Sequence, residues 1–251
     1  MIEEILPPDV VAVEALNDPV DAVLFPEEEA VIAAAVDKRR REFTTVRHCA
    51  RLALAELGLP PVPILPGPDR APRWPAGVVG SLTHCAGYRA AAVARSGDVV
   101  TIGIDAEPHA ALPDGVLDLV SLPAERDRLA ELGRAARTVH WDRLLFSAKE
   151  SVYKAWFPLA GRWLGFEDAE ITIDPDTGGF RARLLVPGPV YHGRELTGFT
   201  GRWSVSGGLV LTAIALLPTE PVGDPAEPTG DSALVSGSDR RAGGAVPPGC
   251  P

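Results

Sequence analysis

The order of hydrophobic and polar positions along the chain predicts helices interspersed with antiparallel strands. Short apolar runs bounded by Gly, Asp or Pro are expected to be strands at 10–13, 78–83, 89–95, 99–105, 169–173, 180–185, 198–205 and 209–216. Helical patterns cover 26–57 (with a break), 112–119, 124–132 and 141–157. Gly58 and Pro60 should end the first helical region, and Pro158 and Gly161 the last. Helices mixed with hairpins favour an α+β fold.

The helix expected at 141–157 has the clearest pattern. Its apolar residues form one broad stripe: Trp141, Leu144, Leu145, Ala148, Val152, Ala155 and Trp156. Glu150 and Lys154 are four residues apart and share a face beside that stripe. An ordinary surface ion pair worth about 0.3–0.5 kcal/mol would explain the spacing equally well.

Lysine usage gives this pair more weight. Only three of the 24 cationic residues are lysines, and two of those, Lys149 and Lys154, bracket Glu150. A compact, mobile ammonium in an arginine-rich chain suggests a chemical role.

The charge is unevenly distributed. The whole chain carries −10, but ten acidic residues and no Lys or Arg lie in 1–37, whereas 38–218 hold 19 acidic and 22 basic residues. This mildly basic middle suits an anionic ligand or an acidic protein, and is too weakly basic to indicate nucleic acid. Residues 219–251, with six Pro and six Gly, are expected to form a disordered tail.

Other features exclude several protein classes. No apolar run is long enough for a membrane helix, and the acidic N-terminus is unlike a secretory signal peptide. The three cysteines (Cys49, Cys85 and Cys250) fit neither a zinc pattern nor a disulfide framework. We therefore expect a cytoplasmic protein.

Acidic residues at the end of a strand indicate a metal site. Asp105 and Glu107 lie two apart where the strand at 99–105 ends, so they share one face. Together with Glu150 they would offer the oxygen ligands that Mg²⁺ prefers. Two solvent-facing acids at a strand end are the simpler alternative.

Two further segments suit phosphate groups. The segment Gly80-Ser81-Leu82-Thr83-His84-Cys85 offers hydroxyls, backbone N–H groups and an imidazole. A basic run covers 38–41, and Arg40, Arg47 and Arg51 have helical spacings of seven and four. Arg70 and Arg73 follow in the Pro-rich loop, and arginine side chains suit phosphate oxygens. A structural histidine and a solvated helix face are the alternatives. There is no Gly-rich phosphate loop and no G-x-G-x-x-G motif.

These segments, taken in order, resemble a known family. The motifs are Arg40-x-Glu42-Phe43-x-x-x-Arg47, Arg70-x-Pro72-x-Trp74-Pro75, the 80–85 segment, Gly103-Ile104-Asp105-Ala106-Glu107 and Phe146-Ser147-Ala148-Lys149-Glu150-Ser151. The chain resembles the Sfp-type 4'-phosphopantetheinyl transferases, in the subgroup similar to the enterobactin-synthetase-activating enzyme. The resemblance spans about 38–157 and excludes the tail.

The resemblance implies a fold and a domain layout. The family's fold is a pseudo-dimer of two similar α+β halves, with coenzyme A in the cleft between them. The halves would be 1–102, with the nucleotide contacts, and 103–218, with the metal site and carrier docking near 112–132. A monomer is expected.

The resemblance also implies residue roles. Asp105, Glu107 and Glu150 would hold Mg²⁺, and Glu150 would act as the base that activates a serine. Lys154 would stabilise the leaving oxygen. Lys149 has no role implied by the resemblance; on a helix it points about 100° away from Glu150, toward the nucleotide or solvent. The coenzyme A contacts would be Arg40, Arg47, Arg70, Ser81, Thr83, His84 and Lys154.

The implied activity is transfer of the 4'-phosphopantetheine arm of coenzyme A to a serine of an apo acyl or peptidyl carrier protein, with release of 3',5'-ADP. Such carriers serve fatty-acid, polyketide or nonribosomal peptide synthesis. Two alternatives stay open on the residues alone. One is a Mg-dependent phosphodiester or pyrophosphate hydrolase, and the other is a non-catalytic coenzyme A-binding module.

Overall fold

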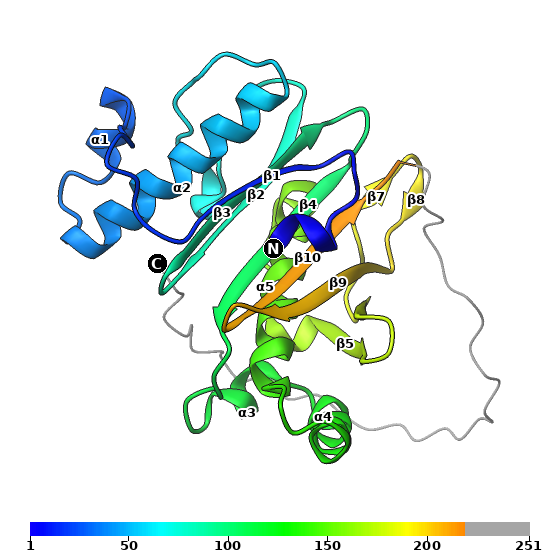
Figure 1. Cartoon of the computed structure of the whole chain (residues 1–251). Coiled ribbons are helices and arrows are strands. Elements are labelled where there is room, and N and C mark those ends of the chain that lie inside the picture. Colours follow the sequence, from blue (N-terminus) through cyan, green and yellow to red (C-terminus); the bar gives the residue numbers. More distant parts are fainter. Residues whose placement is uncertain (219–251) are drawn as a thin grey trace.

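The computed structural model describes residues 1–218 and shows two antiparallel sheets side by side (Figure 1). The predicted tail lies outside the described residues. The strands are β1 (Val11–Ala15), β2 (Val78–Cys85), β3 (Tyr88–Arg95), β4 (Thr101–Pro108), β5 (Ala169–Asp174), β6 (Gly179–Leu184), β7 (Val190–Tyr191), β8 (Arg194–Glu195), β9 (Gly198–Ser206) and β10 (Leu209–Leu216). The α-helices are α1 (Pro26–Val31), α2 (Asp37–Glu56), α3 (Val116–Val120), α4 (Pro123–Ala135) and α5 (Trp141–Ala160). Three short 3-10 turns are η1 (Ile2–Ile5), η2 (Pro68–Arg70) and η3 (Phe166–Asp168). The predicted α+β class is confirmed.

The first sheet has the same strand order as three adjacent strands of the second, β4-β10-β9. The first sheet runs β1-β3-β2 and the second β4-β10-β9-β6-β5, with β7 and β8 forming a separate ribbon. In each half the first strand pairs with the last, and the last two strands form a hairpin. The long helix of each half, α2 or α5, packs on its own sheet. Figure 1 shows α1 and α2 beside the first sheet, and α3 and α4 at the lower end of the second.

A shared core joins the halves. Strand β3 is buried on both faces, which explains its run of alanines in place of polar alternation. Ala91 and Val93 face the core under α2. Ala90, Ala92 and Ala94 face a second core that also contains residues of β4 and β10. The halves therefore bury apolar surface against each other.

Hydroxyl groups bridge β2 and β4 across the junction between the sheets. Ser81 Oγ accepts a hydrogen bond from the N–H of Ile104 at 3.1 Å, and Thr83 Oγ1 accepts one from Ala106 at 3.1 Å. Both hydroxyl residues are almost fully buried. The 80–85 segment thus holds β4 in position by itself, without a bound ligand.

Most element boundaries agree with the sequence pattern, but several differ. Strand β4 covers Thr101–Pro108 and not 99–105, so Asp105 and Glu107 lie within the strand and not where it ends. Helix α5 continues through Pro158 to Ala160 and ends at Gly161, whose φ is 61°. Proline breaks a helix by removing one N–H, yet neighbouring turns packed on a core can hold the helix beyond it. The helix expected at 112–119 forms only at Val116–Val120.

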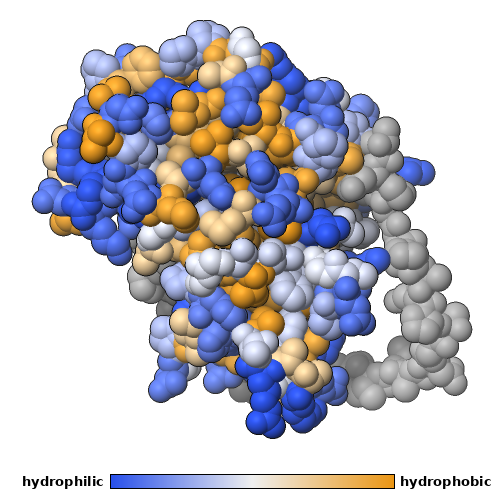
Figure 2. All heavy atoms as spheres, in the orientation of Figure 1, coloured by the Kyte–Doolittle hydropathy of each residue, from blue (hydrophilic) through white to orange (hydrophobic). Residues whose placement is uncertain are grey.

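The surface is mixed in polarity. Figure 2 shows hydrophobic and hydrophilic residues interspersed on the face drawn, with apolar patches most frequent over its upper part. None of the helices in the described part of the chain is long and apolar enough to cross a membrane.

Candidate active site

Two adjoining cavities lie where β2, β4, α2 and α5 meet, and a third lies between α5 and residues 163–169. The acid cavity, of about 320 Å³, is lined by Asp105, Glu107 and Glu150 among others. The large cavity, of about 600 Å³, shares Leu82, His84 and Lys154 with it. The aromatic cavity, of about 260 Å³, shares Glu150 with the acid cavity, and Arg70 and Tyr153 with the large one. One extended ligand could therefore occupy all three.

The acids meet because α5 lies directly on β4. Gly103 makes this approach possible, since a Cβ at that position would sit 2.0 Å from the carbonyl oxygen of Ser151. Behind it, the hydroxyls of Ser147 and Ser151 hydrogen-bond Thr212 Oγ1 of β10 at 2.9 and 2.6 Å. Small residues on both elements thus bring Glu150 of the helix into the same cavity as Asp105 of the strand.

Two cations already hold two of the carboxylates. Lys154 Nζ lies 2.7 Å from Asp105 Oδ1 and also donates to the carbonyl of Ile104. Arg143 donates to Glu107 Oε2 at 2.8 Å. The Glu150 carboxylate has no hydrogen-bond partner within residues 1–218. One acid of the three is therefore uncompensated by direct contact.

The acid cavity favours the neutral form of two carboxyls. Burial, with the nearby charge of Asp105, raises the pKa of both Glu107 and Glu150 to about 7. Burial alone would lower the pKa of Lys154, but the negative charges of Asp105 and Glu150 outweigh it and raise that pKa. Ionising both glutamates therefore places negative charge in the cavity that burial and Asp105 disfavour and that a further cation would stabilise.

The donor set suits a hard divalent cation, although it is not a preformed cage. In the described part of the chain, no three His, Cys, Asp or Glu side chains converge closely enough to enclose a metal ion as they stand. Asp105 Oδ2, however, is buried and lacks a hydrogen-bond partner among these residues. Mg²⁺ usually binds one or two carboxylates and completes its shell with water and substrate phosphate, so a full cage is not required.

His84 lies between the acid and large cavities as a neutral imidazole. Arg39 Nη1 lies 2.8 Å from its Nε2, which must therefore be the unprotonated acceptor, and Nδ1 faces Glu42 Oε2 at 3.5 Å. Burial lowers the pKa of His84 to about 4, and Arg39 and Lys154 reinforce this against the opposite effect of Glu42. The ring is thus held in a fixed orientation.

Comparison with known proteins identifies the family. Residues 27–94 match the model of the 4'-phosphopantetheinyl transferase N-terminal domain, and residues 101–205 match that of the 4'-phosphopantetheinyl transferase superfamily. The chain is 60% identical over 219 residues to 4'-phosphopantetheinyl transferase Svp of Streptomyces mobaraensis, covering 86% of this chain and 89% of that one.

This chain belongs to the 4'-phosphopantetheinyl transferase superfamily.

Further relatives agree. The transferase is 57% identical to 4'-phosphopantetheinyl transferase PptT of Mycobacterium tuberculosis, over 83% of this chain and 92% of that one. Enterobactin synthase component D of Escherichia coli K12 is 40% identical over 120 residues, 47% of this chain and 55% of that protein. The predicted family is confirmed: the protein is an enzyme that transfers the 4'-phosphopantetheine group, and the family's substrate is coenzyme A.

The structure of the transferase brings most of the predicted site residues together. Nine of the ten line the acid or the large cavity: Asp105, Glu107, Glu150, Lys154, His84, Thr83, Ser81, Arg47 and Arg70. Arg40 does not line these cavities, because it pairs with Glu29 at 2.7 Å and donates to the carbonyl of Ile32. The roles of these residues stay predictions.

Arg39 is a site residue that the sequence pattern did not predict. It lines the large cavity with Phe43, Val46 and Arg47, at positions i, i+4, i+7 and i+8 of α2. The arginines at 40, 47 and 51 also have helical spacing, so spacing alone did not identify the correct face. The apolar residues Phe43 and Val46, which lie between Arg39 and Arg47 on the same helix face, indicate which face of α2 is turned toward the protein interior.

Arg47 lines the large cavity and also makes contacts that hold α2 to the segment after it. Its guanidinium lies 3.6 Å from the Phe43 ring centroid and donates to the carbonyl of Ile64, and burial lowers its pKa to about 10.

Lys149 lies neither toward solvent nor in the large cavity, contrary to expectation. It is 4% exposed, and its Nζ lies 2.8 Å from Glu125 Oε2. The sequence could not show this, because Glu125 belongs to α4, a different helix.

Proposed function

We propose that this transferase moves the 4'-phosphopantetheine arm from coenzyme A to a serine of an apo acyl or peptidyl carrier protein, releasing 3',5'-ADP, with Mg²⁺ as cofactor. One observation carries the proposal: Lys154, His84 and three carboxylates line the acid cavity, which shares wall residues with both the large and the aromatic cavity. The acid cavity has the charge pattern needed by a pyrophosphate bound with a cation.

The large cavity suits the nucleotide. Its volume of about 600 Å³ lies within the usual range for small-ligand sites. Arg39, Arg47 and Arg70 supply cationic donors for the 3'-phosphate and the diphosphate, while Trp74 offers a flat apolar surface to the adenine. His84 lies at the boundary with the acid cavity, where its Nε2 accepts from Arg39 and so holds that guanidinium at the cavity wall.

The aromatic cavity suits the uncharged pantetheine arm. The rings of Tyr153 and Trp163 line this cavity with their centroids 4.8 Å apart and their planes tilted by 53°, and Leu164 and Phe166 line it as well. Apolar and aromatic side chains with a few polar groups between them would bind an extended amide-containing chain; the charged residues of this lining are Arg70, Lys149 and Glu150. Its shared wall with the acid cavity at Glu150 places the arm's phosphate end among the carboxylates.

Asp105, Glu107 and Glu150 would hold Mg²⁺, which supplies charge neutralisation and orientation of the diphosphate when bound. The unpartnered Oδ2 of Asp105 is the atom that most favours this assignment.

The chain's own residues then carry the proton and the leaving group. The carrier's serine oxygen bonds to the phosphorus beside the pantetheine arm while the bond from that phosphorus to the bridging oxygen of 3',5'-ADP breaks. Glu150 accepts the serine proton, directly or through a water molecule, because it is the one acid of the three without a hydrogen-bond partner in residues 1–218; burial and Asp105 raise its pKa to about 7 in the metal-free protein. Lys154 stabilises the negative charge on the leaving oxygen.

The partner is expected to be acidic. The mildly basic body between residues 38 and 218 complements an acidic helical carrier. Docking near α3 and α4 agrees with the exposure of Leu119, 73% accessible on α3. We expect the transferase to act as a cytoplasmic monomer.

A mass-spectrometric assay tests the proposal. The transferase is incubated with coenzyme A, Mg²⁺ and several apo carrier proteins, and each carrier is weighed. We expect a gain of one phosphopantetheine arm, abolished by EDTA and restored by Mg²⁺. No gain on any carrier would reject the proposal. Arm release without carrier would indicate a hydrolase, and binding without turnover a coenzyme A-binding module.

A further inference from the structure

Two buried glutamates occupy matching positions in the two halves. Glu28 of α1 and Glu125 of α4 are 0% and 1% exposed. Each is the third residue of a helix that begins with proline. Each carboxylate accepts a hydrogen bond from the backbone N–H of the residue just before its helix: Glu28 from Phe25 at 3.0 Å, and Glu125 from Leu122 at 2.7 Å.

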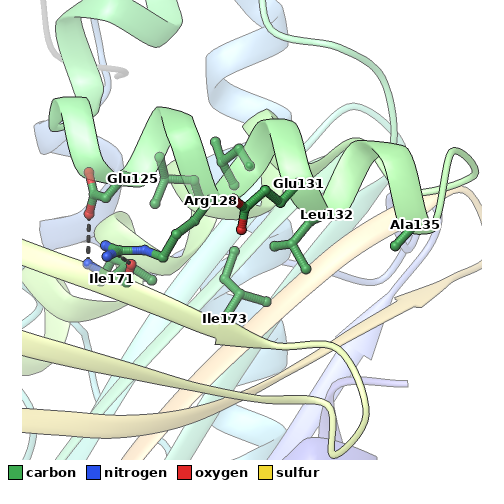
Figure 3. Close-up of a pocket in the computed structure, with 9 residues that line it drawn as sticks. Glu125, Arg128, Glu131, Leu132, Ala135, Ile171 and Ile173 are labelled. Carbon is green, nitrogen blue, oxygen red and sulfur yellow. Dashed lines mark hydrogen bonds between the residues drawn. The ribbon is translucent and has the colours of Figure 1, made fainter.

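The remaining contacts of the two carboxylates also correspond. Glu28 pairs with Arg51 of α2 at 3.0 Å and accepts the N–H of Ile64 at 2.8 Å. Glu125 pairs with Lys149 of α5 at 2.8 Å and accepts the N–H of Ile171 at 2.6 Å. Figure 3 shows Glu125 reaching from α4 to Ile171 on β5. Each carboxylate thus joins three elements: its own helix, the long helix and the segment after it. We call these the first and second clamps.

The second clamp fixes a wall of the aromatic cavity. Lys149 Nζ donates to the carbonyls of Phe166 and Ala169 at 2.6 and 3.0 Å in addition to Glu125, so its three protons all have acceptors. Residues 163–166 form the cavity wall that faces Glu150, and they are tied to α5 through this ammonium group. The residue next to Lys149 on α5 is Glu150 itself.

The first clamp fixes a wall of the large cavity. The N–H of Ile64 is held by Glu28, and its carbonyl accepts a hydrogen bond from Arg47 at 3.3 Å. The next residue, Leu65, accepts the N–H of Arg73 at 2.9 Å. The loop between them carries Arg70, which lines the cavity.

Stability alone is a poor reason to keep such pairs. Replacing a buried ion pair by apolar residues of similar volume is often neutral or stabilising, because both charges lose their hydration on burial. A carboxylate with fixed acceptor directions, by contrast, specifies the relative position of three elements. The clamps therefore fix the relative positions of the elements they join more than they contribute to the free energy of folding.

We propose that Glu28 and Glu125 are equivalent positioning residues, and that each sets a different part of the coenzyme A site. The first clamp positions the loop that binds the nucleotide, and the second positions the wall that holds the pantetheine arm against Glu150. This assignment rests on the proposed placement of the nucleotide and the arm in the large and aromatic cavities.

Two probes separate the clamps. Coenzyme A fills both regions, whereas 3',5'-ADP fills only the nucleotide region. Their affinities are measured for the full chain by calorimetry, along with kcat and KM for coenzyme A. The variants are Glu125→Gln and the pair Glu125→Leu with Lys149→Met, and for the first half Glu28→Gln and the pair Glu28→Leu with Arg51→Met. The double variants leave no lone buried charge, and thermal melting checks whether each variant keeps the fold without the backbone hydrogen bonds of the clamp.

We expect the second-clamp variants to bind 3',5'-ADP within about twofold of wild type but to bind coenzyme A more weakly. Their kcat/KM should fall on the order of 100-fold, because a misplacement near 1 Å has that effect. First-clamp variants should lose affinity for both ligands. Glu170→Gln is the matched control, since Glu170 pairs with Arg128 and Arg183 beside the second clamp but lines none of the three cavities.

Specific outcomes would overturn the inference. A folded double variant at Glu125 and Lys149 with wild-type coenzyme A affinity and turnover would contradict it, as would equal losses for both probes. If neither double variant melts cooperatively, the clamps are structural supports and the inference is wrong. Failure of the proposed function would look different, because the wild-type protein itself would then not transfer the arm.

Discussion

At the scale of single residues, two of the three carboxylates in the acid cavity have a cationic partner and the third has none. Lys154 neutralises Asp105 and Arg143 neutralises Glu107, whereas Glu150 has no direct partner within residues 1–218. This asymmetry supports different roles for the three acids: two held in place and one able to accept a proton. It also shows why the surface-pair alternative for Glu150 and Lys154 is incomplete, since the lysine contacts Asp105 on another element.

We predict that Glu150→Gln abolishes turnover while the protein stays folded. Loss of a general base and metal ligand should lower kcat by about 10²–10⁴-fold. The melting temperature of the metal-free protein should not fall, since the change removes a negative charge close to Asp105. Carrier mass gain and thermal melting measure the two effects. Glu56→Gln, at the exposed end of α2 and outside the three cavities, is the control. Near-normal transfer by Glu150→Gln would remove Glu150 from the mechanism.

His84 should titrate near pH 4 in the coenzyme-free protein, because burial, Arg39 and Lys154 disfavour its charged form and outweigh Glu42. Its folded pKa lies below the unfolded value of about 6.5. The contribution of this group to stability is therefore fully present above pH 6.5 and is lost as pH falls toward 4. NMR titration of the ring measures it. A pKa at or above 6.5 would mean that the ring is not held as the neutral acceptor of Arg39.

At the scale of elements, the decisive contact is that of α5 with β4. Neither element carries the site alone, since Asp105 lies on the strand and Glu150 on the helix. Gly103 and the hydroxyls of Ser147, Ser151 and Thr212 set their separation. The two clamps act at the same scale and fix the loops on either side.

Gly103→Ala should disrupt this contact. A Cβ would lie 2.0 Å from Ser151 O and 2.8 Å from the nitrogen of Ala155, so α5 must move away from β4. We expect a loss of about 1–3 kcal/mol in the free energy of unfolding and a fall in kcat on the order of 100-fold. Denaturant unfolding and the transfer assay measure these effects.

Gly133→Ala on α4 is the matched control, because nothing lies within 4 Å of its Cβ position. It should stabilise the protein by about 0.5–1 kcal/mol through helix propensity and leave transfer unchanged. Equal behaviour of the two variants would show that the close approach at Gly103 is unimportant.

At the scale of the whole molecule, two halves with the same strand order share a core. The matching orders β1-β3-β2 and β4-β10-β9, with the paired clamps, favour the predicted pseudo-dimer. Superposing 11–95 on 101–216 is the direct test of that relation. The domain boundaries at 102 and 218 stay predictions.

Neither half should fold alone. The core between the sheets contains residues of β3 from the first half and of β4 and β10 from the second. A fragment covering 1–98 would expose one side of the alanine-rich strand β3. We expect it to lack a cooperative thermal transition, as measured by circular dichroism, and to gain one when mixed with a 99–218 fragment. An independently folded first fragment would contradict this.

Removal of residues 220–251 should leave transfer intact. All the residues that line the three cavities lie before position 170. The deletion also removes three of the chain's excess negative charges. Carrier mass gain compared with the full chain measures the effect. A large loss would show that the tail takes part in carrier binding or catalysis.

The sequence by itself determined the elements and the chemistry of the site. Hydrophobic periodicity and Gly and Pro positions located nearly every helix and strand, because these signals act within a few residues. The motifs around Asp105 and Glu150 indicated the family, and the rarity of lysine pointed to the correct helix. All three lysines do lie on cavity walls.

Only the tertiary structure decided how these groups are divided between function and support. It placed Arg39 rather than Arg40 in the large cavity, engaged Ser81 and Thr83 in joining the sheets, and buried Lys149 against Glu125. The physical reason is that each of these outcomes depends on which groups from distant segments meet. A charged side chain exposed on an isolated helix and one buried in a clamp have the same local sequence signal, and only packing distinguishes them.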